Sequence, residues 1–157
     1  MALNNPYIQG NTVERKHLVA LVNRLTDDEL SRALEADWIV SAVLAHLAFW
    51  DQRALTLLNK WKQDGIGPSP MDTDIVNEAM RLHCLAIPPR TAAHLAIDCA
   101  VAIDQAIAEL DPAMLADVET NGKTVRLDRA HHRRVHLEQI EQALGINSQM
   151  DQDSQVM

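Results

Sequence analysis

The chain has 157 residues, of which 47% are hydrophobic and only five are glycine, a composition typical of one helical domain with its own core. Its formal net charge is −8, and acidic residues surround its one dense basic cluster, which contains Arg126, Arg129, Arg133 and Arg134. Because nucleic-acid binding normally requires a basic patch, we expect no nucleic-acid partner.

The sequence also favours a cytoplasmic protein without a membrane partner. No stretch reaches the roughly 18 apolar residues of a membrane span, and the N-terminal "MALNNPYIQGN" has neither the basic nor the apolar region of a signal peptide. Cys84 and Cys99 lie in apolar, helix-like surroundings without CxxC spacing. This pattern is typical of buried free thiols in a reducing compartment, with a catalytic thiol as the less favoured alternative.

The first half of the chain is expected to be largely helical. Residues 1–11 resemble a flexible lead-in, and residues 11–25 follow as a helix with a cap at its first residues. A short helix or turn is expected at residues 26–34. Residues 36–65 form the strongest helical segment, since neither Gly nor Pro interrupts it before Gly65 ends it.

In the second half of the chain, two more helices are expected, at residues 74–87 and 90–110. A turn-rich segment follows at residues 111–127, then a last long helix at residues 128–144 and a polar tail at residues 146–157. Four long helices with short connections predict an all-α, four-helix up-down bundle with short extra helical segments. We expect this bundle to be one domain over residues 12–145, with flexible tails at residues 1–11 and 146–157.

The last helix holds three of the chain's seven histidines, His131, His132 and His136. A projection at about 100° per residue places His132 and His136 on one apolar stripe, His131 at its edge, and Arg133 and Arg134 away from its centre. The stripe also carries Val135, Gln139, Ile140 and Ala143. His132 and His136, one turn apart on a face expected to be buried, can share one ion.

His46 is expected to face the core from the middle of the segment 36–65. The same projection places Ile39, Val43, Phe49, Trp50, Arg53 and Leu57 on or beside its face. A single buried histidine is usually a hydrogen-bonded core residue, but three inward imidazoles match a catalytic metal shell with an open fourth position. We therefore predict a divalent metal on His46, His132 and His136, with affinity falling as pH drops through about 6.5.

Four stretches carry a family resemblance: "LVNRLTDDELSRAL", "WIVSAVLAHLAFWDQR", "DTDIVNEAM" and "RLDRAHHRRVHLEQIEQAL". Together they resemble the DinB-like superfamily of four-helix-bundle metalloproteins, which includes the metal-binding domain of thiol-dependent maleylpyruvate isomerases. The most specific feature is Trp38, followed eight residues later by His46, combined with the distal HxxxH of His132 and His136.

The resemblance covers roughly residues 12–145 and implies a bundle with a long crossover. It implies a divalent ion on His46, His132 and His136, for which zinc or nickel is expected. It also implies a homodimer, and thiol transfer or isomerisation of a small molecule with a low-molecular-weight thiol.

Trp50, Arg53 and Asn77 are candidate pocket residues, although tryptophans at helical spacing usually belong to the core and such an arginine more often forms an ion pair. Phe49 is expected to form an apolar wall with Trp50. His131 could replace His132 if the last helix is rotated. Catalytic residues stay unassigned, and no organic cofactor is expected. Besides thiol transfer and isomerisation, such a metal centre could catalyse hydrolysis of a small molecule. The alternative to an enzyme is a non-catalytic metal-binding or ligand-binding helical bundle.

Overall fold

The computed structural model describes residues 4–146, which contain seven α-helices, one short 3₁₀ helix and no strand. The bounds are α1 Ile8–Arg24, α2 Asp27–Leu30, η1 Glu35–Asp37, α3 Val40–Asp64, α4 Thr73–Ala86, α5 Pro89–Ala108, α6 Pro112–Asn121 and α7 Ala130–Leu144. The prediction of an all-α fold is confirmed. The tail expected at 146–157 lies, from residue 147 on, outside the described residues, as do residues 1–3 of the expected lead-in.

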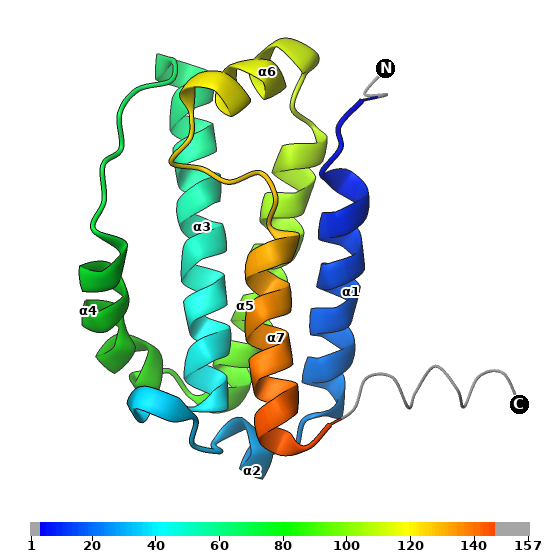
Figure 1. The fold of residues 1–157 in the computed structure, drawn as a ribbon, viewed down its shortest axis with the longest axis vertical. Coiled ribbons are helices and arrows are strands. Elements are labelled where there is room, and N and C mark those ends of the chain that lie inside the picture. The colour runs from blue at the N-terminus through cyan, green and yellow to red at the C-terminus, as the bar shows by residue number, and fades with distance from the viewer. Residues whose placement is uncertain (1–3, 147–157) are drawn as a thin grey trace, which may run out of the picture.

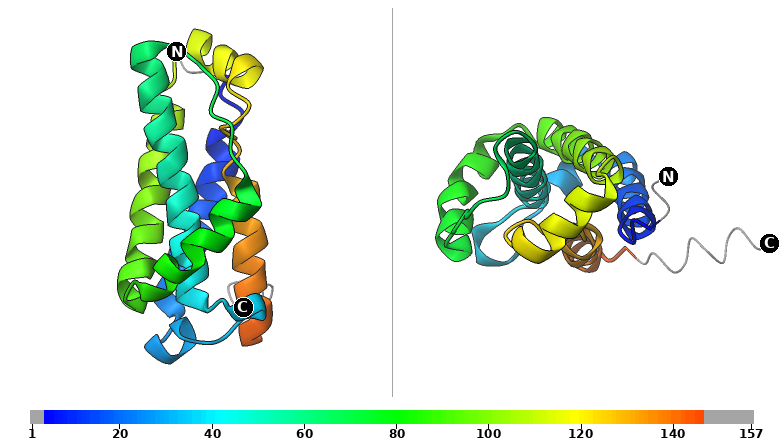
Figure 2. Two further views of the ribbon diagram at one scale, coloured as in Figure 1. Left: turned by 90° about the vertical axis from the view of Figure 1, so that its left-hand side faces the viewer. Right: turned by 90° about the horizontal axis from the view of Figure 1, so that it is seen from above.

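Four long helices, α1, α3, α5 and α7, lie side by side along the long axis of the molecule (Figure 1). Helix α3 packs against α5, and α1 packs against both α5 and α7. Helix α4 packs on the outer side of α3, while α2 and α6 lie at opposite ends (Figure 2). Helices α3 and α5 run in the same direction, because α4 and the loop before it carry the chain back to the end where α3 began. The four long helices therefore do not alternate in direction along the chain, as they would in a simple up-down bundle.

Local chemistry explains where many of the helices begin and end. Thr26 forms a capping box with Glu29 at the start of α2, and the Asp72 carboxylate accepts from the amide of Ile75 in α4. At their C-terminal ends, α3 and α7 stop at Gly65 and Gly145, whose φ angles of 83° and 67° favour glycine. These two helix ends are where the sequence predicted them.

The start of α1 differs from the expected lead-in at residues 1–11. The helix already begins at Ile8, and the Asn5 side chain donates a 2.8 Å hydrogen bond to the carbonyl of Ile107. Asn11, expected as a cap of its own helix, is instead buried inside α1. The helix therefore starts earlier than predicted, and the side chains of Asn5 and Asn11 bond to carbonyl groups about a hundred residues away in the chain.

The main core lies between α1, α3, α5 and α7, and a second cluster fills the end covered by α6. The first contains Leu18, Leu44, Leu47, Leu137 and Ile140, and the second Leu58, Trp61, Ile103, Ile107 and Val118. Small residues line the α3–α5 contact, among them Ala42, Ala45, Ala92, Ala93 and Ala96. Small side chains let two helix backbones approach closely, in keeping with the extensive contact between α3 and α5.

Helix α5 is, within the described part of the chain, the one helix long and apolar enough to cross a membrane by length and composition. Half of its most apolar stretch of 18 residues is buried, and the helix packs against α1 and α3. A helix in the core of a helical bundle is apolar as well, because other helices surround it.

Candidate metal centre

His46 on α3 and His132 and His136 on α7 form one cluster. Each offers a ring nitrogen, and these nitrogens all lie within 4.8 Å of one another. The Nε2 atoms of His46 and His132 are 3.2 Å apart, and the ring centroids of all three pairs are separated by 4.8 to 5.1 Å. The structure thus brings together the three histidines that the sequence predicted as a ligand set.

The spacing of one nitrogen pair fits a divalent ion. Zinc–nitrogen bonds of about 2.0–2.1 Å at a tetrahedral angle separate two ligand nitrogens by about 3.3 Å, close to the 3.2 Å between His46 and His132. The Nδ1 atom of His136 lies 3.0 Å from Gln139 Oε1, an acceptor, which places the ring proton on Nδ1 and the lone pair on Nε2. The Nδ1 atom of His46 is buried and has no hydrogen-bond partner in the described chain.

Burial keeps the three imidazoles neutral. It lowers the pKa of His46 to about 4, with His136 as a second cause, and it lowers the pKa of His136 as well. Burial also lowers the pKa of His132 to about 2, with further contributions from the two other histidines, Arg129 and Arg133. At neutral pH all three rings therefore have a lone pair available for an ion.

The orientation of α7 corrects the helical projection. Arg133, expected away from the core, is only 1% exposed, whereas Val135, expected on the core stripe, is 48% exposed. The core face of the helix carries Ala130, Arg133, Leu137 and Ile140. His132 and His136 lie beside this face, half-buried, and turn toward α3 and a cavity.

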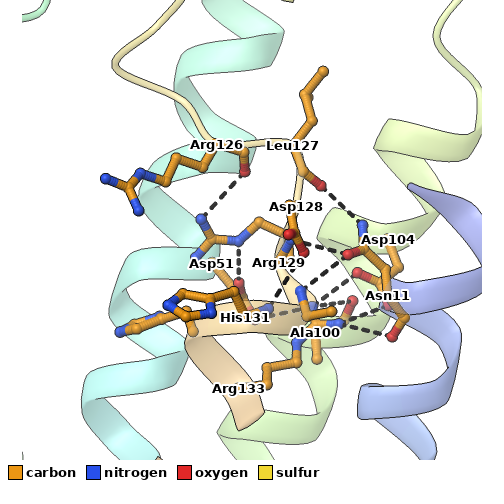
Figure 3. Close-up of polar contacts among 12 residues, drawn as sticks. Asn11, Asp51, Ala100, Asp104, Arg126, Leu127, Asp128, Arg129, His131 and Arg133 are labelled. Carbon is orange, nitrogen blue, oxygen red and sulfur yellow. Dashed lines mark hydrogen bonds and ion pairs between the residues drawn. The ribbon is translucent and has the colours of Figure 1, made fainter. Parts of the chain in front are cut away.

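A buried ion-pair network explains this rotation (Figure 3). The Arg133 guanidinium donates to Asp104 on α5 at 2.8 and 2.9 Å and to Asp51 on α3 at 3.2 Å. Arg129 Nε donates to Asp51 at 2.8 Å, and Arg15 on α1 donates to Asp104 at 2.5 Å. Because a buried guanidinium is tolerated only when it is paired, these contacts hold the start of α7 against three other helices.

Asp51 and Asp104 were missed as functional candidates by the sequence analysis. Each is a buried acid whose neighbours three and four residues away along the helix are all apolar, and that was the available signal. They support the histidines indirectly, since Arg133 immediately follows His132 and Asp51 lies on the same helix as His46.

A cavity of about 680 Å³ adjoins the three histidines, between α3, α4, α7 and the segment leading into α7. The predicted pocket residues Trp50, Arg53 and Asn77 all line it, as does Trp38. Trp50 Nε1 donates a 2.9 Å hydrogen bond to Asn77 Oδ1, which fixes the indole between α3 and α4. The volume lies within the range of small-molecule sites.

Phe49 does not line this cavity. Its side chain is 41% exposed, and its ring contacts Trp50 edge-on at a centroid distance of 5.3 Å. The expectation of an apolar wall shared by Phe49 and Trp50 is therefore wrong, because one residue step along a helix turns a side chain by about 100°.

The other singled-out residues lie apart from the histidine cluster. His131 is exposed on the cavity wall and is not one of the clustered ligands. Cys84 and Cys99 are buried free thiols, and burial raises the pKa of both, which keeps them protonated.

A scan against protein-family models, a search of curated proteins and a search of solved structures each found no match for this chain.

Proposed function

We propose that this protein is a divalent-metal-dependent enzyme that acts on a small molecule, by thiol transfer or isomerisation with a low-molecular-weight thiol. The observation that carries the proposal is the cluster of three neutral imidazoles on the wall of a cavity of about 680 Å³. Within the described chain, the cluster contains no fourth His, Cys, Asp or Glu. This donor set suits zinc or nickel and leaves a position for a small-molecule ligand.

When bound on His46, His132 and His136, the ion would lower the pKa of a coordinated thiol or water and so supply a nucleophile at neutral pH. The protein residues around it have separate roles. Gln139 holds His136 in the tautomer whose Nε2 accepts an ion. Trp38 and Trp50 flank the His46 ring at centroid distances of 5.6 and 6.4 Å and limit the access of water.

We also propose membership of the DinB-like superfamily, with α1, α3, α5 and α7 as a four-helix bundle and α4 within the crossover. The support is the histidine pattern of the sequence together with the packing of these four helices. A cytoplasmic location is proposed with it, in keeping with the free thiols of Cys84 and Cys99.

The test is absorption spectroscopy of the cobalt-substituted protein during titration with small thiols. We expect a sulfur-to-cobalt charge-transfer band that saturates with thiol concentration. The variant His132→Ala/His136→Ala is the control and should give no band, because it lacks two of the three ligands. Stoichiometric cobalt without a band for any thiol would rule out thiol activation.

The second candidate function is a non-catalytic metal-binding or ligand-binding bundle. One observation favours it: Asp128 is the only carboxylate on the described cavity wall, and it is exposed, so no buried acid or base faces the histidines. A screen of the zinc-loaded protein for thiol transfer, isomerisation and ester hydrolysis separates the two candidates. Turnover that disappears in His132→Ala/His136→Ala supports the enzyme, and ligand binding without turnover supports the alternative.

A homodimer is proposed as the assembly. Several apolar side chains on the outer side of α4 are exposed, including Met71 just before the helix, Ile75 and Leu82, and such a stripe suits a two-fold contact. Sedimentation equilibrium at micromolar concentration should give twice the chain mass of 17.5 kDa. A mass of one chain at all concentrations would contradict the proposal.

A further inference from the structure

The cavity wall is rich in positive charge although the chain as a whole carries −8. Three guanidinium groups, those of Arg53, Arg126 and Arg129, belong to the wall, against the single carboxylate of Asp128. Positive charge is therefore concentrated on this concave surface, which is unexpected for an acidic protein unless the cavity receives a negative charge.

Arg53 has only neutral hydrogen-bond partners. It donates to the carbonyl of Thr124 at 2.9 Å and to Ser69 Oγ at 3.0 Å, and its guanidinium lies 5.9 Å from the Trp50 ring centroid. Burial lowers the pKa of Arg53, and repulsion from Arg129 lowers it further. Arg53 is thus held in place by loop carbonyls and a hydroxyl, beside another cation and without a carboxylate.

Arg126 and Arg129 also leave donors unused. The exposed side chain of Arg126 makes no hydrogen bond or ion pair within residues 4–146, and it extends away from the buried network (Figure 3). Arg129 donates from Nε to Asp51, but one of its terminal nitrogens is buried without any partner in that range. Because this nitrogen is itself closed to the cavity, Arg126 is the one of the two whose guanidinium is free to meet a ligand there.

The ion pairs behind the wall do not neutralise this charge. Two carboxylates, Asp51 and Asp104, serve three guanidiniums, those of Arg15, Arg129 and Arg133. One positive charge therefore remains in the network next to the cavity.

We propose that the cavity binds a small molecule that carries a carboxylate, which Arg53 and Arg126 receive, while the other end of the molecule lies at the histidines. Only the placement of the other end of the molecule at the histidines rests on the proposed function. Arg53 follows His46 by two helical turns, about 10 Å along the axis, so several bonds separate the carboxylate from the group at the histidines. Trp50, between them on α3, provides an apolar surface for the middle of the molecule.

A carboxylate fits this site better than a phosphate. Phosphates typically use free backbone amides at a helix N-terminus. At the start of α7, beside the cavity, the amides of Arg129 and Ala130 donate to Asn11 Oδ1, and the amide of His131 donates to Asp128. These three amides are therefore not left for a phosphate, and recognition there is left to guanidinium groups, which pair with a carboxylate in shape and charge.

The experiment uses the metal-free full chain and glutarate as the probe, with affinity measured by calorimetry and amide chemical shifts. We expect saturable binding, no binding of the uncharged dimethyl ester, and about a tenfold or greater loss of affinity in Arg126→Gln. Arg53→Gln should show a similar loss. Lys123→Gln is the matched control, because this substitution removes the same charge from the same segment, whereas Lys123 lies outside this cavity. The affinity of this variant for glutarate should stay within about twofold of wild type.

The exposed guanidinium of Arg126 makes no hydrogen bond or ion pair within residues 4–146, so this variant remains informative if Arg53→Gln does not fold. Glutarate that fails to bind, an equal loss in Lys123→Gln, or binding of inorganic phosphate but not of glutarate would overturn the proposal. The metal proposal is tested separately: His132→Ala/His136→Ala should lose zinc yet bind glutarate within about twofold of wild type, and Arg126→Gln should bind zinc normally.

Discussion

Burial sets the chemistry of the three clustered histidines, because it lowers the pKa of each ring and so favours the neutral form that binds metals. Two of them come from one turn of α7 and the third from the middle of α3. The resulting cluster needs both helices in their observed places.

Replacing His132 and His136 by Ala should abolish stoichiometric zinc binding, since one imidazole cannot hold the ion alone. Elemental analysis of protein purified without a histidine tag measures this. His83→Ala is the control, because His83 is exposed on α4 and is not part of the cluster, and this variant should keep full zinc content. Full occupancy in the double variant would show that other residues bind the ion.

Zinc affinity should persist to lower pH than an ordinary histidine site allows. Protons compete for an imidazole only near and below its pKa in the folded protein, and this pKa is about 4 for His46 and about 2 for His132. The pKa of His136 is lowered too, so the steepest loss of affinity is expected below pH 6.5. Competition titrations with a chelator from pH 8 to pH 4 measure it, and a midpoint at 6.5 would contradict the burial argument.

At the scale of elements, α7 depends on α1 for its first turn. The Asn11 side chain accepts hydrogen bonds from the amides of Arg129 and Ala130 at 2.9 and 3.0 Å and donates one to the carbonyl of Leu127 at 2.9 Å. Asn11 thus caps a helix more than a hundred residues away. Since His132 lies in the first turn of α7, the cap also positions a candidate ligand.

Asn11→Ala should reduce the free energy of unfolding by about 2 kcal/mol, because the cap is lost and buried backbone groups are left without partners. Urea denaturation measures the loss. Asn23→Ala provides the comparison on the same helix: Asn23 is exposed, and its replacement should change stability by less than about 0.5 kcal/mol. Equal effects of the two substitutions would argue against the cap.

At the scale of the whole molecule, charged groups inside the fold join its helices. Asp51 and Asp104 connect α3 and α5 to the arginines of α1 and α7. His17 of α1 lies between Glu14, at 3.0 Å, and Glu141 of α7, at 2.7 Å. The relative placement of α1, α5 and α7 therefore depends on electrostatics as well as on apolar packing.

The His17 contacts should make stability depend on pH. Burial alone lowers the pKa of His17, but hydrogen bonds and charge from Glu14 and Glu141 outweigh it, so the pKa is raised. A raised pKa means that the contribution to stability is fully present below about 6.5 and is lost as pH rises through the folded value. His17→Gln should therefore destabilise the protein more at pH 5.5 than at pH 8.5 in urea denaturation. A larger effect at pH 8.5 would reverse the sign.

Much of this architecture could be predicted from local sequence. Composition and apolar spacing were enough for the all-helical class, and glycine was enough for the ends of α3 and α7, because these depend on neighbouring residues. The spacing of His132 and His136 by one turn likewise guarantees that they lie together wherever the helix packs.

Only the tertiary structure decided how α7 is rotated and what holds it. A prediction from apolar periodicity places an arginine on the solvent-facing side of a helix, because burying an unpaired charge costs too much free energy. Arg133 is nevertheless buried, since Asp51 and Asp104, 82 and 29 residues away in the chain, supply its counter-charges. The same rotation carries His132 and His136 from the expected core stripe to the cavity wall, and such long-range pairing exists only once α3, α5 and α7 have come together.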